Sequence, residues 1–354
     1  MSQRVFLHPG PLKTGTTYLQ SLLYANRESF LSQGVTIVGT QASHYRAAKE
    51  LMRRRPHRKT QGAWSRTRAA VLRAQGDVVM SCERYSLLRV EHAQRVLEDL
   101  DGREVHAVLT LRDVVSVLPA RWQEGIKNGG TASWAEFQDR IVQDPARLRK
   151  ITRAVSTLEV WAAVLPADRI HVVTVPPSSA PRTLLFERFC EAVGADPTRL
   201  QTLEPTRVNR SMDLVTTELV RRVNLQRAVK LSGAAQQSEI KAFLAQELAK
   251  RSRVRPELGA AVLEAAKGET EALVRQIETG GFHVVGDLND LTSTTSSAPT
   301  GGGTEVDPEQ LLDAAAVAVA ALARRSWSRG QRLKRLETRR RFRTARRAWR
   351  RLRR

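Results

Sequence analysis

Short apolar runs alternate with longer amphipathic stretches through the first half of the chain. Four runs rich in Val, Ile and Leu are typical of buried strands, at 4–8, 77–81, 104–111 and 169–175. Stretches with helical periodicity lie between them, at 16–32, 63–75, 86–100, 114–127 and 147–164. This alternation predicts an α/β fold, in which helices cover both faces of a parallel sheet.

The second half of the chain changes character. Its apolar periodicity predicts mostly helices, at 182–194, 213–230, 236–251 and 255–278. The segment "STTSSAPTGGGTEVDPEQ", residues 293–310, has the composition of a flexible linker. We therefore expect an α/β domain over 1–292, a linker over 293–310, and a tail over 311–354 that is first Ala-rich and then Arg-rich.

The positive charge of the chain is concentrated at its end. The formal net charge is +22 over 354 residues. From Arg324 onward there are sixteen Arg or Lys and one acid, Glu337, so this segment carries 16 − 1 = +15 and the rest carries 22 − 15 = +7. This distribution predicts a moderately basic body that handles anions and a strongly basic tail that binds a partner.

Cysteine content and hydropathy favour a reducing compartment. The two cysteines, Cys82 and Cys190, are far apart and form no metal-binding or disulfide pattern. No apolar targeting segment precedes the first predicted strand, and the apolar run 311–323 contains Asp313 and is too short to span a bilayer. We expect a cytoplasmic protein, with peripheral attachment at the inner membrane face as a further expectation.

The stretch "RVFLHPGPLKTGTTYLQSLL", residues 4–23, is a candidate anion site. A strand runs into a loop with two glycines, and a helix follows whose free amides and dipole favour an anion. Lys13, Thr14, Thr16 and Thr17 add donors, Gly15 allows close approach, and Thr16 or Thr17 is expected to cap the helix. The alternative is an ordinary strand-to-helix turn without a ligand.

The position of the lysine distinguishes this loop from the Walker pattern. Gly10 and Gly15 have the Walker spacing, but Thr16 stands where that pattern has its lysine. The stretch "PLKTGTTYLQ" resembles the loop of sulfotransferases that use 3′-phosphoadenosine 5′-phosphosulfate (PAPS). The resemblance implies that Lys13 and the residues up to Thr17 hold the 5′-phosphate beside the sulfonate, within a P-loop-like three-layer fold and without a metal.

A second candidate site follows the strand at 104–111. The resemblance implies an arginine at the strand's end and a serine eight residues later, which together hold the 3′-phosphate of PAPS. Arg112 matches, but Ala120 stands in the serine's place, and Ser116 one helical turn earlier is the candidate substitute. Alone, Arg112 would be read as a strand-end ion pair with Asp113. The resemblance extends to "LPARWQEGIKNG", "VNRSM" and "GFHVVGDLNDL", and so covers roughly residues 4–291.

Sulfonyl transfer to a hydroxyl or amine needs a base and a cation that stabilises the leaving oxygen. Lys13 is the candidate cation, and Glu83, at the end of the strand at 77–81, is the candidate base. The alternative for Glu83 is an ion pair with Arg84 or Arg89 that takes no part in chemistry. His44 is the second candidate base.

The tail combines arginines with large apolar residues. Phe342, Ala345, Trp349 and Leu352 have helical spacing and share a face, and Trp327 precedes them. This pattern favours an anionic membrane surface. Nucleic acid or another polyanion, or no partner at all, are the alternatives.

Three classes of function are consistent with these features. The first is a PAPS-dependent sulfotransferase whose acceptor is a carbohydrate, a lipid or a secondary metabolite. The second is a P-loop nucleotide kinase, which the absence of a lysine after Gly15 disfavours. The third is a non-catalytic binding protein on the same fold, with the tail as its main interaction site.

Overall fold

The structure is a computed structural model, and it describes residues 3–53, 55, 57–202, 212–226, 236–248, 254–292 and 306–352. The chain forms two compact units, each made of several segments. The first unit combines residues 1–122, 134–208 and 257–300, and the second combines 123–133, 209–256 and 301–354. The predicted boundaries at 292 and 310 remain predictions.

The first unit contains a sheet of six strands in the order β2-β3-β1-β4-β5-β6, and every neighbouring pair is parallel. The strands are β1 (Arg4–His8), β2 (Val35–Ile37), β3 (Asp77–Ser81), β4 (Glu104–Leu111), β5 (Ile170–Thr174) and β6 (His283–Val285). The predicted parallel α/β fold is therefore confirmed. The two edge strands β2 and β6 were not predicted, because three residues each are too few to show a periodicity.

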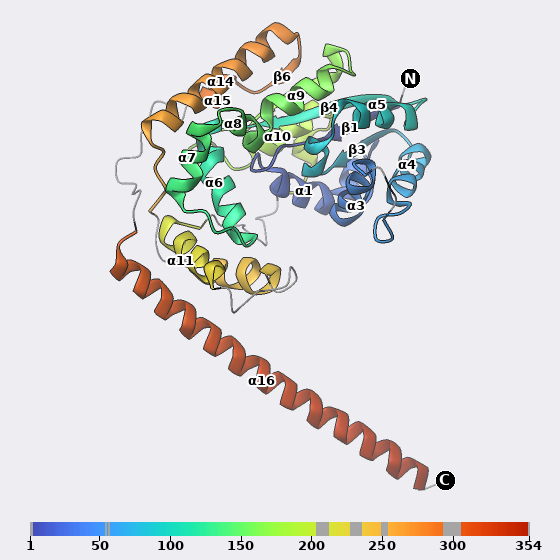
Figure 1. Ribbon diagram of the computed structural model, residues 1–354. Helices are drawn as coiled ribbons and strands as arrows, with labels where there is room; N and C mark the ends of the chain where they lie inside the picture. The colour runs from blue at the N-terminus through green and yellow to red at the C-terminus, as the bar shows by residue number, and fades with distance from the viewer. Residues whose placement is uncertain are drawn as a thin grey trace. The chain divides into compact units, whose positions relative to one another are not determined.

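Helices cover both faces of the sheet, as Figure 1 shows. One face packs against α1 (Thr16–Ala25), α2 (Arg27–Leu31) and α10 (Leu184–Ala192). The other packs against α3 (Gln41–Leu51), α4 (Ala63–Arg73), α5 (Val90–Asp99), α9 (Ala154–Ala162) and α14 (Ala260–Gly280). The three layers are held by two continuous apolar cores, one on each side of the strands.

Two predicted helices are each interrupted once. The stretch 16–32 breaks at Asn26, whose side-chain amide donates to the carbonyls of Leu22, at 3.0 Å, and Gln201, at 2.9 Å. The stretch 147–164 breaks into α8 (Ala146–Thr152) and α9 at Arg153, which has φ of 61° and donates to the Ser86 carbonyl at 2.9 Å. Both breaks depend on partners distant in sequence, so local periodicity could not reveal them.

Two further helices, α6 and α7, lie between β4 and β5 in the sequence. α6 (Val114–Lys127) follows β4 directly and contains Pro119. α7 (Trp134–Gln143) was not predicted, although its buried Trp134 and Ile141 follow a helical spacing. Trp134 donates its indole N–H to the carbonyl of Glu257 at 2.7 Å, which links α7 to the segment before α14.

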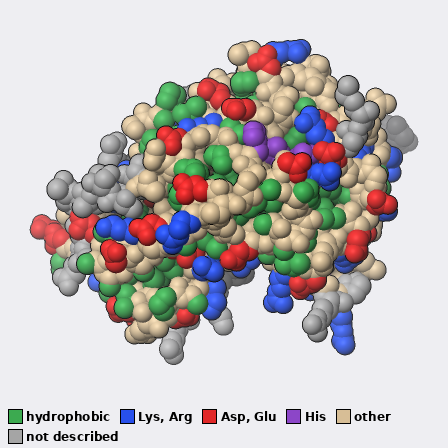
Figure 2. Space-filling model, turned by 90° about the horizontal axis from the view of Figure 1, so that it is seen from above, with side chains coloured by type: hydrophobic (Ala, Val, Ile, Leu, Met, Phe, Trp, Pro, Cys, Tyr) green, Lys and Arg blue, Asp and Glu red, His purple; other side chains and the backbone are tan. Residues whose placement is uncertain are grey.

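Three histidines form a row near the amino ends of β4, β5 and β6. Nδ1 of His106 lies 2.9 Å from Nε2 of His171, and Nδ1 of His171 lies 3.0 Å from Nδ1 of His283. At the other end, Nε2 of His106 donates to the Glu104 carboxylate at 2.7 Å. Figure 2 shows histidine side chains gathered in one place on the face seen from above. We call Glu104, His106, His171 and His283 the histidine row.

The second unit is mainly helical. Its elements include α11 (Leu214–Leu225), the π-helical η4 (Gln236–Leu244), α13 (Ala245–Leu248) and the long α16 (Pro308–Leu352). α16 begins inside the predicted linker, of which residues 293–305 lie outside the described part of the chain. Among the described residues, no helix is both long enough and apolar enough to cross a membrane.

Candidate anion-binding site at the carboxyl ends of the strands

The loop between β1 and α1 has a left-handed backbone at two positions. Lys13 has φ of 75° and Gly15 has φ of 85°. Residues other than glycine seldom adopt this conformation, and such strain concentrates at functional sites. Gly15 is the N-cap of α1, and no side chain caps the first turn. The predicted cap by Thr16 or Thr17 is therefore wrong, because the helix begins at Thr16 directly after the left-handed glycine. The first amides of a ten-residue helix lack a side-chain cap, which suits an anion.

Both glycines of the loop are required by close contacts. A Cβ at Gly10 would lie 2.5 Å from Nε2 of His8 and 2.7 Å from Oγ1 of Thr110. A Cβ at Gly15 would lie 2.4 Å from Cδ2 of Leu185 and would meet an unfavourable φ. The loop therefore follows a path against β4 and α10 that only glycine permits at these positions.

A chain of buried polar side chains connects the ends of the strands to the loop. Nδ1 of His8 lies 2.8 Å from the Ser81 hydroxyl, and Nε2 lies 3.1 Å from the Thr110 hydroxyl. The Thr110 and Thr14 hydroxyls are 2.8 Å apart, and Thr14 donates to the carbonyl of Pro11 at 2.7 Å. We call Ser81, His8, Thr110 and Thr14 the loop network. It connects three adjacent strands to the loop, so Thr14 contributes to the shape of the site through its side chain.

Burial keeps the centre of this network neutral. The imidazole of His8 is fully buried, and burial lowers its pKa to about 3. A neutral imidazole can donate with one nitrogen and accept with the other, which suits two hydroxyl neighbours. The sequence analysis missed His8, Ser81 and Thr110. The available signal was that all three stand at or near the carboxyl ends of predicted strands.

The order of the strands brings the predicted site residues together at the carboxyl ends of three neighbouring strands. β3, β1 and β4 are neighbours, and they lead to Glu83, the loop and Arg112 respectively. Neighbouring strands are about 4.8 Å apart, so the ends of β3 and β4 are separated by about 10 Å. The strand order reverses beside β1, and open parallel sheets bind ligands outside the carboxyl ends at such a point.

Arg112 follows β4 directly and is half-exposed. Its Nε lies 3.6 Å from Oδ2 of Asp113. The other carboxylate oxygen of the buried Asp113 accepts the backbone N–H of Ser116 at 2.6 Å, at the start of α6. The ion pair that the sequence offered as the alternative is therefore present, as a single long contact. Asp113 is held mainly by the helix, and Ser116 and Ala120 follow on α6.

Glu83 begins the short helix η1 (Glu83–Leu87) after β3 and is half-buried. Arg84 donates to the Tyr45 hydroxyl at 3.0 Å and lies over the Tyr45 ring. Arg89 makes a long contact of 3.9 Å with Glu91. Within the part of the chain that the structure describes, neither arginine forms an ion pair with Glu83. The alternative role of Glu83 as their partner has no support in this geometry.

His44, the second candidate base, lies on α3 and is buried. Its Nε2 donates to the Val38 carbonyl at 2.7 Å, and its Nδ1 lies 3.2 Å from the Tyr85 hydroxyl. Because a neutral imidazole has one donor and one acceptor, Nδ1 accepts from Tyr85. Burial lowers the pKa of His44. Both nitrogens are thus engaged, which leaves Glu83 as the stronger candidate.

Two side chains of α1 that the sequence analysis missed face the end of β3. Gln20 donates to the Ser81 carbonyl at 3.3 Å. Among the described residues, Oε1 of Gln20 and the hydroxyl of Tyr24 are buried without a hydrogen-bond partner. Burial, with the nearby Cys82 thiol, raises the pKa of Tyr24 to about 12, and burial raises that of Cys82 to about 12 as well. Tyr24 is thus a donor at neutral pH, and Cys82 is not a thiolate nucleophile.

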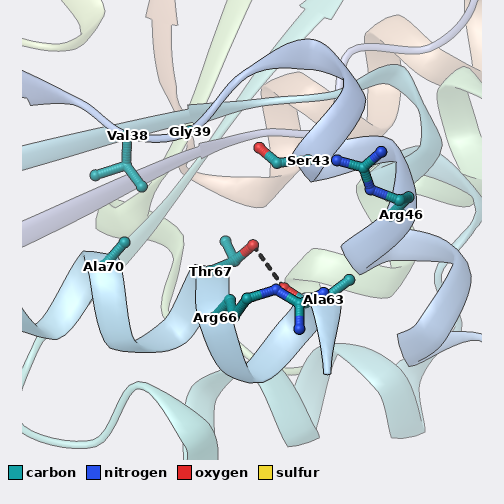
Figure 3. A pocket seen from close by; sticks show the side chains of 8 residues that line it. All are labelled: Val38, Gly39, Ser43, Arg46, Ala63, Arg66, Thr67 and Ala70. Atoms are coloured by element: carbon teal, nitrogen blue, oxygen red, sulfur yellow. Dashed lines mark hydrogen bonds between the residues drawn. The ribbon is translucent and has the colours of Figure 1, made fainter. Parts of the chain in front are cut away.

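A separate cavity of about 210 Å³ lies between α3 and α4. Figure 3 shows Arg46 and Arg66 on opposite sides of it, with the Thr67 hydroxyl donating to the Ala63 carbonyl at 2.9 Å. None of the residues that line it is a predicted site residue. This cavity is therefore distinct from the edge formed by the loop, Glu83 and Arg112.

No cluster of His, Cys, Asp or Glu with the arrangement of a metal site occurs among the residues that the structure describes. Side chains and a helix end supply positive charge at the carboxyl ends of the strands. Lys13, Arg112 and the amino end of α1 supply it. A phosphate or sulfate group is the chemistry that these donors suit.

No protein-family model and no curated protein matches the chain. Among solved structures, the chain is similar to a crystal structure of a sulfotransferase from Alicyclobacillus acidocaldarius, with 14% sequence identity and a TM-score of 0.36. The match covers 67% of this chain and 100% of that chain.

Proposed function

We propose that the protein is a sulfotransferase that moves the sulfonate of PAPS to a hydroxyl or amine of an acceptor. The observation that carries the proposal is the loop between β1 and α1. It combines a left-handed Lys13, a left-handed Gly15 and a helix without a side-chain cap. The sequence of this loop, "PLKTGTTYLQ", resembles the loop of PAPS-dependent sulfotransferases, and these backbone features are what a phosphate cradle requires.

The residues at the carboxyl ends of β3, β1 and β4 fit a nucleotide with two phosphate groups. Lys13 and the amides up to Thr17 would hold the 5′-phosphosulfate, and Gly10 and Gly15 keep the backbone close to it. Arg112 would hold the 3′-phosphate after exchanging its long contact with Asp113 for a charge-assisted hydrogen bond. Ser116, at the start of α6, is the candidate for the second contact.

When bound, PAPS supplies the sulfonyl group and the phosphate oxygen that leaves with the nucleotide. Glu83 would accept the proton of the attacking acceptor oxygen or nitrogen while the new bond to sulfur forms. Lys13 would stabilise the negative charge that develops on the phosphate oxygen as its bond to sulfur breaks. The products are the sulfated acceptor and adenosine 3′,5′-bisphosphate.

Tyr24 is the candidate for orienting the acceptor. Its buried hydroxyl has no partner among the described residues, and it belongs to the same electrostatic neighbourhood as Glu83. Because its pKa is raised to about 12, it stays protonated at neutral pH and would donate a hydrogen bond to an acceptor oxygen that reaches this buried position. A carbohydrate, a lipid or a secondary metabolite with a free hydroxyl would each meet this requirement.

A transfer assay tests the proposal. The purified chain would be incubated with PAPS and a panel of hydroxyl and amine compounds in the presence of EDTA, and adenosine 3′,5′-bisphosphate would be measured by chromatography. We expect its release to depend on both protein and acceptor and to persist in EDTA. Phosphoryl transfer from ATP that requires Mg²⁺, with PAPS inert, would instead indicate a P-loop kinase.

A further inference from the structure

The first half of α16 has two apolar faces, and the described part of the chain packs against only one of them. Leu311, Ala314, Ala318 and Ala321 are buried, and their spacing of three and four residues places them along one side of the helix. This side contacts α11, η4 and α13 within the second unit. The packing gives the amino-terminal part of α16 a fixed rotation about its own axis.

Charged contacts hold the next turns of the helix in the same rotation. Arg325 and Arg329 both pair with Glu239 of η4, at 3.6 Å and 3.1 Å. The guanidinium of Arg325 also lies 4.1 Å from the centre of the Phe243 ring. Cation–π and ion-pair contacts of this kind orient the helix even where each contributes little energy.

The opposite face exposes large apolar side chains. Leu312 is 71% exposed, Val319 is 67% exposed and Trp327 is 70% exposed. They are separated by seven and eight residues, which at 3.6 residues per turn keeps all three on one side of the helix. We call Leu312, Val319 and Trp327 the apolar stripe. Ala316 and Ala323 are exposed on the same side between these residues, so this face of the helix is apolar along its length, which is typical of an interaction surface.

The segment that continues this helix carries strong positive charge. From Arg324 onward the sequence has sixteen basic residues and one acid, and α16 continues as helix to Leu352. The side chains of Phe342, Ala345, Trp349 and Leu352, which the sequence predicts on one face, lie outside the described part of the structure. The apolar stripe and the basic segment thus belong to the same continuous helix.

We infer that α16 binds the surface of an anionic lipid bilayer, with the apolar stripe inserted among the headgroups and the basic segment against the lipid phosphates. A helix lies in a membrane interface when apolar burial and attraction to anionic lipid act together. A tryptophan at the border of the stripe and the basic segment suits the headgroup level. The inference is independent of the proposed sulfotransferase activity.

Charge and apolar burial together favour an anionic bilayer over a second copy of the chain or a nucleic acid. A second copy of the chain packed in parallel on the stripe would bring two segments of +15 together, and the single acid Glu337 could not compensate them. Nucleic acid would attract the basic segment through its phosphates, but it offers nothing for Leu312 and Val319, which precede that segment. An anionic bilayer satisfies both the charge and the apolar side chains.

Co-sedimentation of the full chain with vesicles tests the inference. The probes are vesicles of phosphatidylcholine alone and of phosphatidylcholine mixed with phosphatidylglycerol. The variant Leu312→Asp/Val319→Asp replaces two of the three residues of the apolar stripe by charged ones. Leu31→Asp/Val142→Asp is the matched control, because Leu31 and Val142 are likewise exposed, lie outside α16, and the same two substitutions add the same charge. Circular dichroism checks that all variants fold.

We expect binding to vesicles that contain phosphatidylglycerol and little binding to phosphatidylcholine alone. The variant Leu312→Asp/Val319→Asp should bind at least about tenfold more weakly, whereas the control Leu31→Asp/Val142→Asp should change affinity by about twofold at most. Absence of binding to the anionic vesicles would overturn the inference. So would equal losses for Leu312→Asp/Val319→Asp and the control, which would indicate polyanion attraction alone. A dimer in light scattering that Leu312→Asp/Val319→Asp abolishes would show that a second copy covers the stripe.

Discussion

Two polar networks lie on one face of the same sheet, one near the carboxyl ends of the strands and the other near their amino ends. The loop network crosses β3, β1 and β4 near their carboxyl ends and continues into the loop through Thr14. The histidine row crosses β4, β5 and β6 near their amino ends and finishes at the exposed His283. Both contain a histidine that burial keeps neutral, His8 and His171, with pKa values lowered to about 3 and about 4.

The difference lies in what each network is connected to. In the histidine row, Glu104 accepts from Nε2 of His106 and also lies 4.0 Å from Arg169. Nδ1 of His106 therefore accepts from His171, and Nδ1 of His171 accepts from His283, so this hydrogen-bond chain runs along the amino ends of the strands. The loop network instead leads to the loop between β1 and α1. The glycines and the left-handed lysine of this loop take no part in strand pairing. The comparison therefore supports the proposed nucleotide site at the carboxyl ends of the strands, and it predicts that the histidine row contributes to stability alone.

The largest expected effect is the difference between two carboxylates at opposite ends of the strands, Glu83 and Glu104. Glu83→Gln preserves shape and removes the candidate base, so kcat should fall by about 10²–10⁴-fold while affinity for adenosine 3′,5′-bisphosphate stays unchanged. Glu104→Gln is the matched change in the histidine row and should leave kcat intact. Steady-state kinetics with a working acceptor measure both. Equal kcat for Glu83→Gln and the wild type would move the base to the acceptor itself.

Arg112→Ala tests the second contact to the nucleotide. The loss of one charge-assisted hydrogen bond should weaken adenosine 3′,5′-bisphosphate by roughly 1.5–3 kcal/mol. Adenosine 5′-phosphosulfate lacks the 3′-phosphate, so its affinity should change much less. Ala120→Ser should be neutral or should tighten the bisphosphate. Equal losses for both nucleotides in Arg112→Ala would remove this residue from the 3′-phosphate.

Gly10→Ala tests whether the loop network shapes the site. The added Cβ would collide with His8 and Thr110, and overpacking of this kind destabilises by about 1–3 kcal/mol. Nucleotide affinity should fall as well, because the loop must move. The control is Gly268→Ala in α14, where no atom lies within 4 Å and alanine favours the helix. Urea unfolding and calorimetry should show both losses in Gly10→Ala and neither in Gly268→Ala.

The smallest effect is a pH dependence shared by both networks. An unfolded histidine has a pKa of about 6.5, whereas burial lowers that of His8 to about 3. The unfolded chain therefore binds the proton more readily, and stability present above about pH 6.5 is lost as the pH falls toward 3. At about pH 5.5 the His8 contribution should be lower by about 1.4 kcal/mol.

Urea unfolding near pH 7.5 and pH 5.5 measures this loss. His171, whose pKa is lowered to about 4 first by burial and then by His106 and His283, should lose stability in the same direction. His171→Asn should reduce the pH dependence without affecting nucleotide affinity. A pH dependence that is unchanged in this variant would contradict the neutral state of the histidine row.

Local sequence patterns predicted most of the strands and the approximate position of the loop. Four apolar runs and the glycine spacing carry their signal within a few residues, so β1, β3, β4 and β5 and the start of α1 follow from them. The three-residue strands β2 and β6 have too little sequence for a period. The break at Arg153 depends on a carbonyl of Ser86, which only tertiary structure brings near.

The supporting residues of the site could not be predicted in the same way. His8, Ser81 and Thr110 act together because β3, β1 and β4 are neighbours, and the strand order is not visible in the sequence. The capping role predicted for Thr16 or Thr17 failed because the left-handed Gly15 precedes the helix. The roles proposed for Lys13 and Glu83 remain predictions, now with neighbours against which they can be tested.

Calorimetry with adenosine 3′,5′-bisphosphate in EDTA tests the central claim most directly, on the wild type and on Lys13→Ala. We predict that the wild type binds the bisphosphate without metal and that Lys13→Ala, which removes a charge-assisted contact worth roughly 1.5–3 kcal/mol, binds it about 10–150-fold more weakly. ATP with Mg²⁺ should bind the wild type more weakly than the bisphosphate does. Unchanged affinity in Lys13→Ala, or a preference for ATP with Mg²⁺, would contradict the assignment of the loop.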